Sequence, residues 1–495
     1  MFTAHSTDIS PLVLNPDTFR EELVRAAHWA ADYLQALPSS PVTTPMPDEH
    51  RRALSTPALS DDGKPASTFL DFVSSEIAPY SGGNGHPAFF AWITTPPAPT
   101  GIIAHLLGAT LNASCGYGEN ALVELERGAV RALAELAGLP AGTGGVLTSG
   151  GSMANLLCLA AARTWFLRGR GAVDGEAYDE AHARLVCYQS AETHMSVSKS
   201  ARTIGMPSSR VRAVPTTSDQ RMDVVALRAA VDADVAAGLL PFCVVSSLGT
   251  TSTGAVDPIA EITAVCREFG MWHHGDGAYG GLGAAHPALA PHYEGVGQLD
   301  SLTIDPHKTL NTPIACGAAL VTKPARLQEA FTVEASYLEG NDDWPWLSDY
   351  TVELTRPGDR ALAVHAVLHH LGRQGVTALI DGYLRHTEHL RRLVDEEPEL
   401  ELAAAGPWSI TCLRYRPAGY DGDLDDLTAR IAAEVQRRGA AFLATVRVHG
   451  ELALRVSICG HRTTKADVET LVAEILDVGR GYVSRISARR RVSLR

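Results

Sequence analysis

The sequence has few cysteines, and their spacing indicates neither a metal site nor a disulfide framework. Eight cysteines are spread over 495 residues, and no two of them form a CxxC pair. Most lie in apolar stretches, where a thiol usually acts as a small buried hydrophobe. The pattern argues against a zinc site and against a secreted scaffold held together by disulfides, and it favours a reducing compartment.

Other absences narrow the class of protein further. The segment Met1–Pro16 has no basic start followed by an apolar run, and no stretch approaches the roughly 18 apolar residues of a membrane span. Positive charge is in deficit, with a formal net charge of −14. Because an acidic surface repels phosphate backbones, we expect no nucleic-acid partner. These features predict a cytoplasmic protein that binds neither nucleic acid nor membrane.

The composition and length are those of a globular protein with more than one domain. Hydrophobic residues make up 45% of the chain and charged residues 20%, and 495 residues exceed what one core usually organises. We predict an N-terminal helical arm and dimerisation segment over 1–98, a large domain over 99–373 and a small C-terminal α+β domain over 374–495. A helix is expected over 21–36, followed by an extended arm rich in proline, serine and aspartate over 38–66.

The large domain alternates short apolar runs with helical stretches, which predicts an α/β fold around a mostly parallel sheet. The expected strands are Gly145–Thr148, Leu185–Tyr188, Phe242–Ser246, Met271–His274, Ser301–Ile304 and Gly317–Val321, with helices over Ala154–Arg163 and Ile259–Phe269 among them. In the C-terminal part we expect a strand over Trp408–Tyr415, a helix over Leu427–Arg438, and a hairpin of Ala441–Val448 and Leu452–Ile458 about His449 and Gly450.

Three groups in the large domain fit a site for a phosphorylated pyridoxal cofactor. Thr148-Ser149-Gly150-Gly151-Ser152 follows a strand and begins a helix, so its backbone N–H groups could hold a phosphate. Asp276 and Lys308 each follow a strand, where ligand sites of open α/β sheets lie. Such a cofactor needs a lysine for its Schiff base and an acid against its ring nitrogen. His194 follows another strand and could stack on the ring.

Further motifs, in order along the chain, resemble those of the group II pyridoxal-phosphate decarboxylases, the family of aromatic-L-amino-acid and glutamate decarboxylases. They are His86-Pro87-Ala88-Phe89-Phe90-Ala91, Glu124-Leu125-Glu126-Arg127, the glycine turn Thr148-Ser149-Gly150-Gly151-Ser152, Leu248-Gly249-Thr250-Thr251, Asp276-Gly277-Ala278-Tyr279, Pro306-His307-Lys308 and Arg462-Thr463-Thr464. The resemblance runs from about residue 20 to about 475 and includes the family's 32-residue step from Asp276 to Lys308. It implies a fold type I transferase-like large domain with a seven-stranded sheet.

The resemblance also implies a role for each matching residue. Lys308 would form the Schiff base, Asp276 would pair with the pyridine nitrogen, and His194 and Ala278 would contact the two faces of the ring. The remaining cofactor contacts would be Gly151 and Ser152 at the phosphate, Thr251 near the ring acid or the ring substituents, and His307 on the substrate side or at the phosphate. The acid that returns a proton to the substrate would be His194 or Tyr350, and Tyr350 would lie in a mobile loop that reaches a neighbouring subunit, so the family implies a homodimer.

The predicted reaction is the decarboxylation of an L-amino acid to an amine and CO₂ by a carboxy-lyase. His86, Phe89, Phe90, Trp92 and Thr94 resemble the family's pocket-lining segment, and their aromatic character favours an aromatic or bulky substrate. Other pyridoxal-phosphate reactions on the same fold remain open: transamination, retro-aldol cleavage and decarboxylation-coupled oxidation. A non-catalytic protein that keeps the fold is a further alternative, against which Lys308, Asp276 and His194 argue.

Three positions depart from the family pattern. Asp305 stands where many relatives have asparagine, next to the expected phosphate, and Glu119-Asn120-Ala121 replaces a Ser-Pro-Ala of the aromatic enzymes. Gly277 replaces a frequent alanine. The first two differences bear more on the choice of substrate than on the cofactor.

Overall fold

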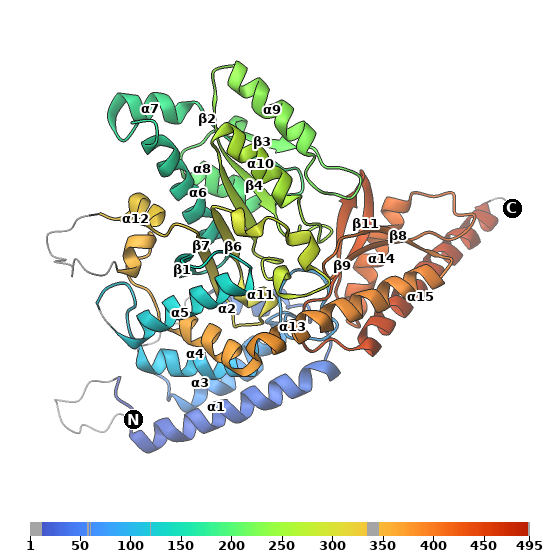
Figure 1. Cartoon of the computed structure of the whole chain (residues 1–495). Helices are drawn as coiled ribbons and strands as arrows, with labels where there is room; N and C mark the ends of the chain where they lie inside the picture. Colours follow the sequence, from blue (N-terminus) through green and yellow to red (C-terminus); the bar gives the residue numbers. More distant parts are fainter. Residues whose placement is uncertain (1–11, 57–58, 60, 119, 334–345, 494–495) are drawn as a thin grey trace.

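The computed structural model describes residues 12–56, 59, 61–118, 120–333 and 346–493. It contains a large α/β domain, a smaller α+β unit at the C-terminal end, and N-terminal helices that lie along one side of both (Figure 1). No helix in these described ranges is both long and apolar enough to cross a bilayer.

The large domain is built on a seven-stranded sheet in the order β1-β7-β6-β5-β4-β2-β3. Its strands are β1 (Gly144–Thr148), β2 (Leu185–Ser190), β3 (Val211–Val214), β4 (Leu240–Ser247), β5 (Trp272–Gly277), β6 (Ser301–Ile304) and β7 (Gly317–Val321). Only β7 runs against its neighbours, so β1, β2, β3, β4, β5 and β6 all point the same way. The sequence prediction of a mostly parallel seven-stranded sheet is therefore confirmed.

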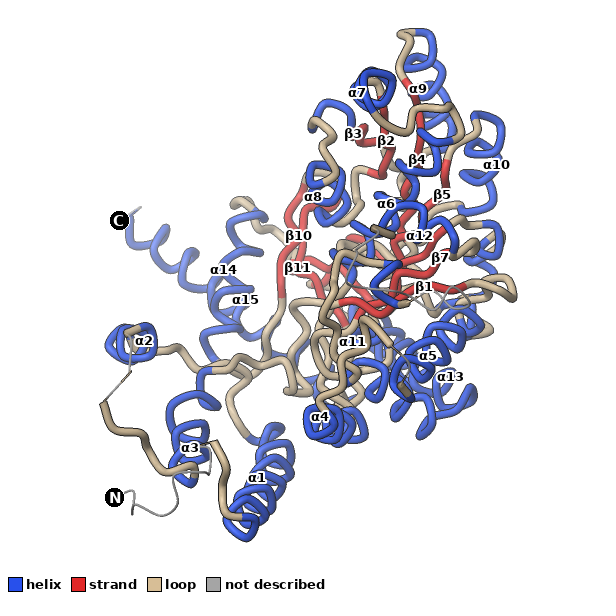
Figure 2. Tube along the Cα trace, turned by 90° about the vertical axis from the view of Figure 1, so that its left-hand side faces the viewer, coloured by secondary structure: helices blue, strands red, loops and turns tan. Residues whose placement is uncertain are grey.

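Helices cover both faces of this sheet, as the continuous apolar strands require (Figure 2). They include α4 (Pro99–Leu111), α5 (Ala121–Leu136), α6 (Gly151–Arg168), α7 (Gly175–Ala183), α8 (Met195–Thr203), α9 (Val224–Ala236), α10 (Ile259–Phe269), α11 (Pro306–Thr309), α12 (Ala325–Phe331) and α13 (Asp359–Glu396). Helices α6 and α8 pack on one face, and α5, α9, α10 and the first half of α13 pack on the other. The first half of α13 ends at Gly372, whose backbone leaves the helical conformation.

The C-terminal unit is a four-stranded antiparallel sheet in the order β10-β11-β9-β8. It consists of β8 (Leu400–Ala405), β9 (Ile410–Tyr415), β10 (Ala444–Val448) and β11 (Glu451–Ser457), with α14 (Leu424–Arg438) and α15 (Lys465–Ser493) packed against it. His449 and Gly450 form the expected two-residue turn, and both have the positive φ that this turn needs. The predicted hairpin is confirmed.

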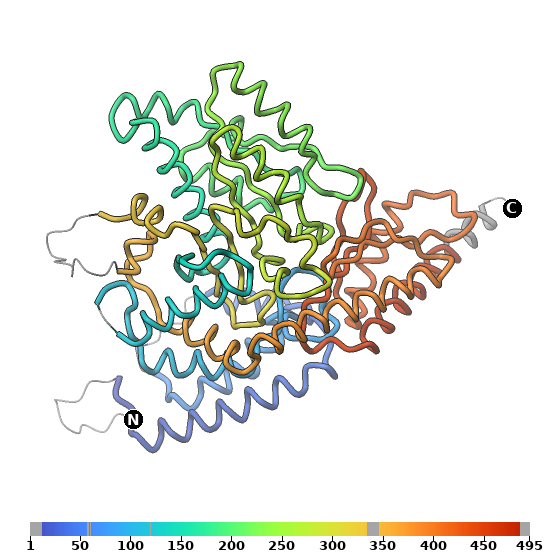
Figure 3. Tube along the Cα trace, viewed as in Figure 1, coloured from blue at the N-terminus to red at the C-terminus, as the bar shows by residue number. Residues whose placement is uncertain are grey.

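The N-terminal part contains α1 (Pro16–Ala36), α2 (Asp48–Ser55) and α3 (Ser67–Phe72), and α1 has no buried residue. Figure 3 shows this part passing beneath both the large domain and the C-terminal unit. Because α2 lies within 38–66, the expectation of an extended arm over that whole segment was wrong. The aspartate and glutamate of its first turn suit a helix start, although the segment has little apolar periodicity.

A buried ion pair fixes the strand that precedes the glycine turn. The Arg356 guanidinium donates to a Glu126 carboxylate oxygen at 2.5 Å and to the Leu147 carbonyl at 2.7 Å. Glu126 in turn accepts the Leu147 N–H at 2.8 Å, and both charged side chains are 1% exposed. The pair therefore joins α5, β1 and the segment before α13.

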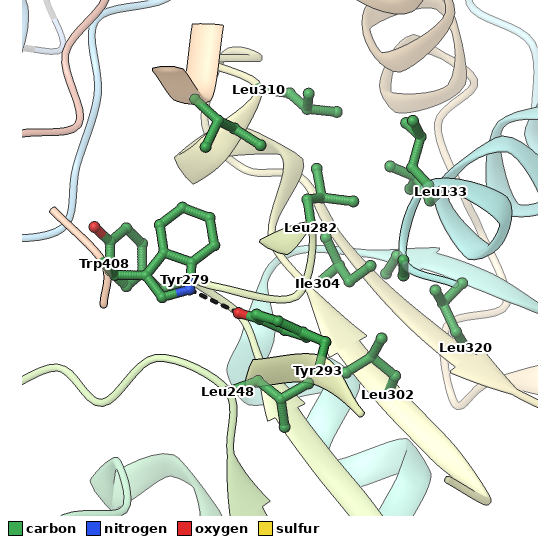
Figure 4. Close-up of a cluster of buried hydrophobic side chains, with 14 of the residues drawn as sticks. Leu133, Leu248, Tyr279, Leu282, Tyr293, Leu302, Ile304, Leu310, Leu320 and Trp408 are labelled. Atoms are coloured by element: carbon green, nitrogen blue, oxygen red, sulfur yellow. Dashed lines mark hydrogen bonds between the residues drawn. The ribbon is translucent and has the colours of Figure 1, made fainter. Parts of the chain in front are cut away.

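Aromatic residues join the C-terminal unit to the strand ends of the large sheet (Figure 4). The Trp408 indole N–H donates to the Tyr293 hydroxyl at 2.6 Å, and Tyr293 donates to the Gly280 carbonyl. The Tyr279 hydroxyl lies 2.5 Å from the Ser409 hydroxyl. All four of these side chains are buried, so the loop after β5 is held by residues from both units.

Candidate active site

A cavity of about 350 Å³ lies at the carboxyl ends of the parallel strands. This is the edge at which open α/β sheets bind ligands. It is lined by the glycine turn, by mostly polar residues at or after the ends of β2, β4, β5 and β6, and by Ile314 before β7. The lining residues are Ser149, Gly150, Gly151, Ser152, Met153, His194, Ser196, Ser247, Gly249, Thr250, Thr251, Asp276, Ala278, Tyr279, Asp305, His307, Lys308 and Ile314.

The glycine turn leaves room at the start of α6 that no side chain could share. Gly150 has a φ of +148°, which disfavours other residues. A Cβ on Gly151 would lie 2.9 Å from the Ala278 Cβ and 3.0 Å from an Asp305 carboxylate oxygen. Because the first N–H groups of a helix have no intrahelical acceptor, this turn can receive an anion.

Asp276 is the penultimate residue of β5, and two hydrogen bonds hold its side chain. Its carboxylate accepts the Ala278 N–H at 3.2 Å and the Asn155 side-chain amide at 3.1 Å. The residue is 7% exposed and lies beside Ser247 of β4 and Thr303 of β6 in the sheet register. The carboxylate is therefore oriented before any ligand binds.

Lys308 lies in the short helix α11, directly after β6. Its Nζ is 3.0 Å from a carboxylate oxygen of Asp305, whose side chain is 2% exposed. His307 approaches the same carboxylate, with its Nε2 3.6 Å away. The other Asp305 oxygen has no hydrogen-bond partner among the described residues. Asp305, which departs from the family pattern, is thus the counter-ion of Lys308 in this structure.

His194 caps α8 and faces the charged groups of the cavity. Its Nδ1 is 2.8 Å from the Ser196 hydroxyl. Burial lowers the pKa of His194, the positive charges of Lys308 and Lys199 lower it further, and Asp276 and Asp305 act in the opposite direction. Because burial is the largest of these effects, the imidazole is neutral at neutral pH.

The structure brings together every residue that the sequence assigned to the cofactor. They come from five different elements or the turns that follow them, and all line the one cavity: Gly151, Ser152, His194, Thr251, Asp276, Ala278, His307 and Lys308. The departure at Gly277 has a steric reason, since a Cβ there would lie 2.7 Å from Gly281 Cα and 2.9 Å from the Thr303 carbonyl oxygen. Glu119 lies outside the described residues.

Tyr350 lies elsewhere. It belongs to the short helix η8 (Leu347–Tyr350) and lines a second cavity of about 320 Å³ with Arg127, Val130 and Leu347. Burial raises the pKa of its phenol. Within one chain, Tyr350 is therefore not part of the cavity that contains Lys308, and the segment before it, 334–345, lies outside the described residues.

The segment expected to line the substrate pocket is divided between core and surface. Phe89 and Phe90 are buried against the C-terminal unit, and the Phe89 ring stacks on Phe442 at 5.2 Å between centroids. His86 is buried and bonds the Ser40 carbonyl, while Trp92 is 59% exposed. None of these lines the cavity.

Thr94 lies nearer to the site through its neighbour. The Thr95 hydroxyl donates to the His307 carbonyl at 2.8 Å, and the Cys459 thiol contacts the Thr94 carbonyl. Only the Thr94 end of the predicted pocket segment therefore lies next to the turn that contains Lys308. The aromatic residues of the segment pack against other parts of the chain.

Sequence reasoning missed Asn155, which touches the ring-acid candidate Asp276. Asn155 is fully buried in α6, four residues after Gly151. Residues four apart share one face of a helix, so this spacing places Asn155 on the cavity side. That periodicity was the available signal, but its contacts with β5 and β6 depend on the tertiary fold.

Comparisons with known proteins agree with this geometry. Residues 47–416 match the family model described as the pyridoxal-dependent decarboxylase conserved domain. An aromatic-L-amino-acid decarboxylase of Bacillus atrophaeus is 26% identical over 478 residues, which cover 94% of this chain and 96% of that protein. An L-2,4-diaminobutyrate decarboxylase of Rhizobium meliloti is 31% identical over 431 residues, covering 86% and 82%.

A solved structure gives the same result for the fold. The crystal structure of Oryza sativa TDC with PLP and tryptamine superposes with a TM-score of 0.89 and 26% sequence identity. The match covers 96% of this chain and 99% of that one.

Proposed function

This chain belongs to the pyridoxal-dependent decarboxylase family, and from that premise we propose that the Lys308 cavity removes the α-carboxylate of an aromatic L-amino acid. The protein is a carboxy-lyase that uses pyridoxal 5′-phosphate and acts on a small-molecule amino acid. The observation that carries the proposal is the meeting of Lys308, Asp276 and the glycine turn in one cavity.

The residues present fit the cofactor. A phosphate needs a turn with free N–H groups and no side chain in the way, and a Cβ at Gly151 would collide with Ala278. An aldehyde needs an amine, and Lys308 supplies one in the same cavity. A pyridine nitrogen needs an acid, and Asp276 is already oriented by two hydrogen bonds.

The family resemblance and this geometry together support a specific assignment of roles. Lys308 would hold the cofactor aldehyde through its amine, and Asp276 would pair with the ring nitrogen. Gly151 and Ser152 would hold the phosphate. His194 and Ala278 would contact the two faces of the ring, and Thr251 and His307 would lie at its edges.

The bound cofactor supplies an electron sink for the pair of electrons that the departing carboxylate leaves on the substrate. The chain's own groups prepare this step. The Asp276 carboxylate would face the ring nitrogen, and a carboxylate there would favour the protonated form of that nitrogen. Lys308 can hold a proton at Nζ among the residues that line the cavity. Within one chain we assign to Lys308 the return of a proton to the substrate, because the neutral His194 imidazole is a poor acid and Tyr350 lies in another cavity.

Substrate class rests on the relatives and on the cavity rim. The Bacillus atrophaeus relative is named for aromatic L-amino acids, and the Oryza sativa structure contains tryptamine. Ile314 lines the cavity and is 59% exposed, so it offers an apolar contact to a large side chain. The Rhizobium meliloti relative acts on a diamino acid, and L-2,4-diaminobutyrate is therefore the competing substrate to test.

A homodimer is the assembly that the surface supports. Helix α4 exposes an apolar row, with Ile103, Leu106, Leu107 and Leu111 between 50% and 61% exposed. Helix α1 also has no buried residue. Contiguous apolar patches of this kind usually mark an interface. A second copy that covers α1 and α4 would also approach the rim of the cavity at Ile314, since α4 and residue 313 are in contact through Gly101.

We further propose a reducing, cytoplasmic location and the three-domain division of 1–98, 99–373 and 374–495. All eight cysteines are buried and unpaired, which suits a reducing compartment. The break of α13 at Gly372 lies next to the boundary proposed at residue 373.

Product analysis of the holoenzyme tests the proposed function. The enzyme, loaded with pyridoxal 5′-phosphate, is incubated with L-tryptophan, L-tyrosine, L-phenylalanine, L-2,4-diaminobutyrate and L-glutamate, and amine and CO₂ are measured. We expect equal amounts of amine and CO₂ from an aromatic substrate and none from Lys308→Ala. Aldehyde or keto acid as the main product, or undiminished amine formation by Lys308→Ala, would refute the proposal.

The dimer has a separate test by light scattering. Leu106→Glu should give a monomer, because it buries a charge in the apolar face of α4. Val225→Glu is the matched control, since Val225 is also an exposed apolar helical residue, 80% exposed, but lies on α9 at the far side of the large domain (Figure 1). A wild-type chain that is monomeric at micromolar concentration would contradict the dimer.

A further inference from the structure

Asn155 makes four hydrogen bonds from a fully buried position in α6. Its amide nitrogen donates to an Asp276 carboxylate oxygen at 3.1 Å and to the Ser196 hydroxyl at 3.0 Å. Its carbonyl oxygen lies 3.0 Å from His274 Nε2 and 2.7 Å from the Thr303 hydroxyl. Every hydrogen-bonding capacity of the side-chain amide is therefore used, which is expected for a polar group that is out of contact with water.

The surrounding groups decide which way the amide points. The Thr303 hydroxyl and the His274 ring both approach the same Asn155 atom. His274 is completely buried, and burial lowers its pKa to about 4, so the ring is neutral. Its Nδ1 lies 2.8 Å from the Ser301 hydroxyl, which also accepts the Trp272 indole N–H. Because the Asp276 carboxylate only accepts, the Asn155 NH₂ group faces it and the Asn155 oxygen faces His274 Nε2, which must therefore be the donor.

With two donors on one side, the Asn155 oxygen must face them and its NH₂ group must face Asp276 and Ser196. The opposite orientation would set donors against donors and leave a buried carboxylate oxygen against a carbonyl. The Asp276 carboxylate, which only accepts, and the Thr303 hydroxyl, which donates, thus fix the direction in which Asn155 donates.

The second N–H of Asn155 extends this order to His194. Since Ser196 accepts from Asn155, its hydroxyl hydrogen is free to donate to His194 Nδ1, 2.8 Å away. The Ser196 N–H approaches the same Nδ1 at 3.3 Å. His194 Nδ1 is then an acceptor, and the single ring hydrogen of the neutral imidazole lies on Nε2.

We propose that Asn155 is a positioning residue that orients the Asp276 carboxylate toward the cofactor ring nitrogen and, through Ser196, sets the tautomer of His194. This inference rests on the proposed function, since it concerns the same cavity. It assigns one buried amide to two groups, Asp276 in β5 and His194 at the start of α8, which would act on the ring nitrogen and the ring face of the cofactor. Asn155 itself does not line the cavity.

The decisive measurement is cofactor binding, made on the full-length protein. Asn155→Leu removes both donors at nearly constant volume. A hydrogen bond to a buried charge is worth about 1.5–3 kcal/mol, so we expect the Kd for pyridoxal 5′-phosphate to rise roughly 10- to 100-fold. We also expect the visible absorbance maximum of the bound cofactor to move, since the ring nitrogen loses its oriented acid. If Asn155→Leu is not recovered folded, Asn155→Ser is judged by the same two readouts.

Two further variants separate positioning from loss of a buried polar group. His273→Gln is the matched control. His273 precedes His274 in β5 and is buried like Asn155, but its ring bonds Ser246 and Thr263, neither of which lines the cavity. Its Kd and spectrum should equal those of the wild type. Ser196→Ala breaks only the branch to His194, so it should keep the Kd within about threefold and lower kcat.

The outcomes distinguish this inference from the proposed function. A wild-type protein that binds no cofactor and shows no visible band would end the proposed function itself. A wild type that binds, together with an Asn155→Leu protein of unchanged Kd and unchanged spectrum, would overturn the role of Asn155 alone. An equal loss of cofactor in His273→Gln would also overturn it, because the effect would then follow from burial and not from Asp276.

Discussion

Removing the guanidinium of Arg356 should destabilise the large domain more than any other single change to its buried ion pair. Arg356→Met leaves the Glu126 carboxylate 1% exposed with only the Leu147 N–H as a donor. Glu126→Gln is milder, because Arg356 keeps Glu353 at 3.1 Å and the Leu147 carbonyl at 2.7 Å. Loss of the Arg356 charge should therefore cost more stability than loss of the Glu126 charge.

The expected magnitude follows from the burial of both charges. Breaking one partner of a buried pair costs about 3–5 kcal/mol, because an uncompensated charge remains, whereas replacing both partners by apolar residues is often neutral. We expect about 3–5 kcal/mol for Arg356→Met, roughly half of that for Glu126→Gln, and less than about 1.5 kcal/mol for the double variant Glu126→Leu/Arg356→Met. The double variant should thus be more stable than Arg356→Met alone.

The assay is urea denaturation followed by circular dichroism, at pH 8 and at pH 5. Burial already raises the pKa of Glu126, and Arg356 lowers it. Without Arg356 the folded pKa rises further above the unfolded value, so the folded state gains stability below that pKa and loses it as pH rises. Arg356→Met should therefore be less impaired at pH 5 than at pH 8. A loss below about 1 kcal/mol, or a double variant that loses the sum of the two single changes, would refute this reasoning.

Three further changes test other parts of the structure. Gly151→Ala should abolish cofactor binding in equilibrium dialysis, because the new Cβ would lie 2.9 Å from the Ala278 Cβ; binding at the wild-type Kd would contradict the assignment of the phosphate turn. Asp305→Asn should lower the Kd for pyridoxal 5′-phosphate several-fold at low salt, because it removes a buried carboxylate beside that turn and the ion pair that holds Lys308. A higher Kd, measured by the same dialysis, would show that the carboxylate helps to hold the phosphate. Burial lowers the pKa of His273 to about 3, so its contribution to stability is complete above the ordinary value near 6.5 and is lost by about 1.4 kcal/mol per pH unit as pH falls toward 3. The difference in unfolding free energy between wild type and His273→Gln should therefore shrink with acid, and a constant difference from pH 7 to pH 4 would be inconsistent with a neutral buried imidazole.

Strands with a continuous apolar run were predictable, because a run of consecutive apolar residues indicates a strand that is buried on both faces. Ser301–Ile304 and Gly317–Val321 were expected at the bounds that the structure has, and both are buried throughout. β3 and β8 could not be predicted in the same way. β3 contains Arg212 and is half-exposed, and β8 contains glutamate and several alanines, with little alternation of apolar and polar residues. Helix α2 could not be predicted from apolar periodicity, because none of its residues is buried.

Some residues of the candidate site were also predictable from local sequence signals, whereas others were not. Lys308, Asp276 and the glycine turn were predictable because each is a local signal at the end of a strand, and the resemblance supplied their roles. Asn155 was not, because a buried asparagine inside a helix has no meaning until β5 and β6 are placed beside it. Within one chain, Phe89 and Phe90 pack against Phe442 and its neighbours, so their place in the substrate pocket stays a prediction.

The bonds from Tyr279 to Ser409 and from Tyr293 to Trp408 bear on the order in which the protein can be made. Tyr279 lines the cavity, yet its partner leaves the ribosome 130 residues later in the sequence. A nascent chain that ends before β9 therefore carries Lys308, Asp276 and the glycine turn with one wall unsupported and its tyrosine rings uncovered. The ability to retain a cofactor should thus arise late in synthesis, after the C-terminal sheet has closed against the loop that follows β5.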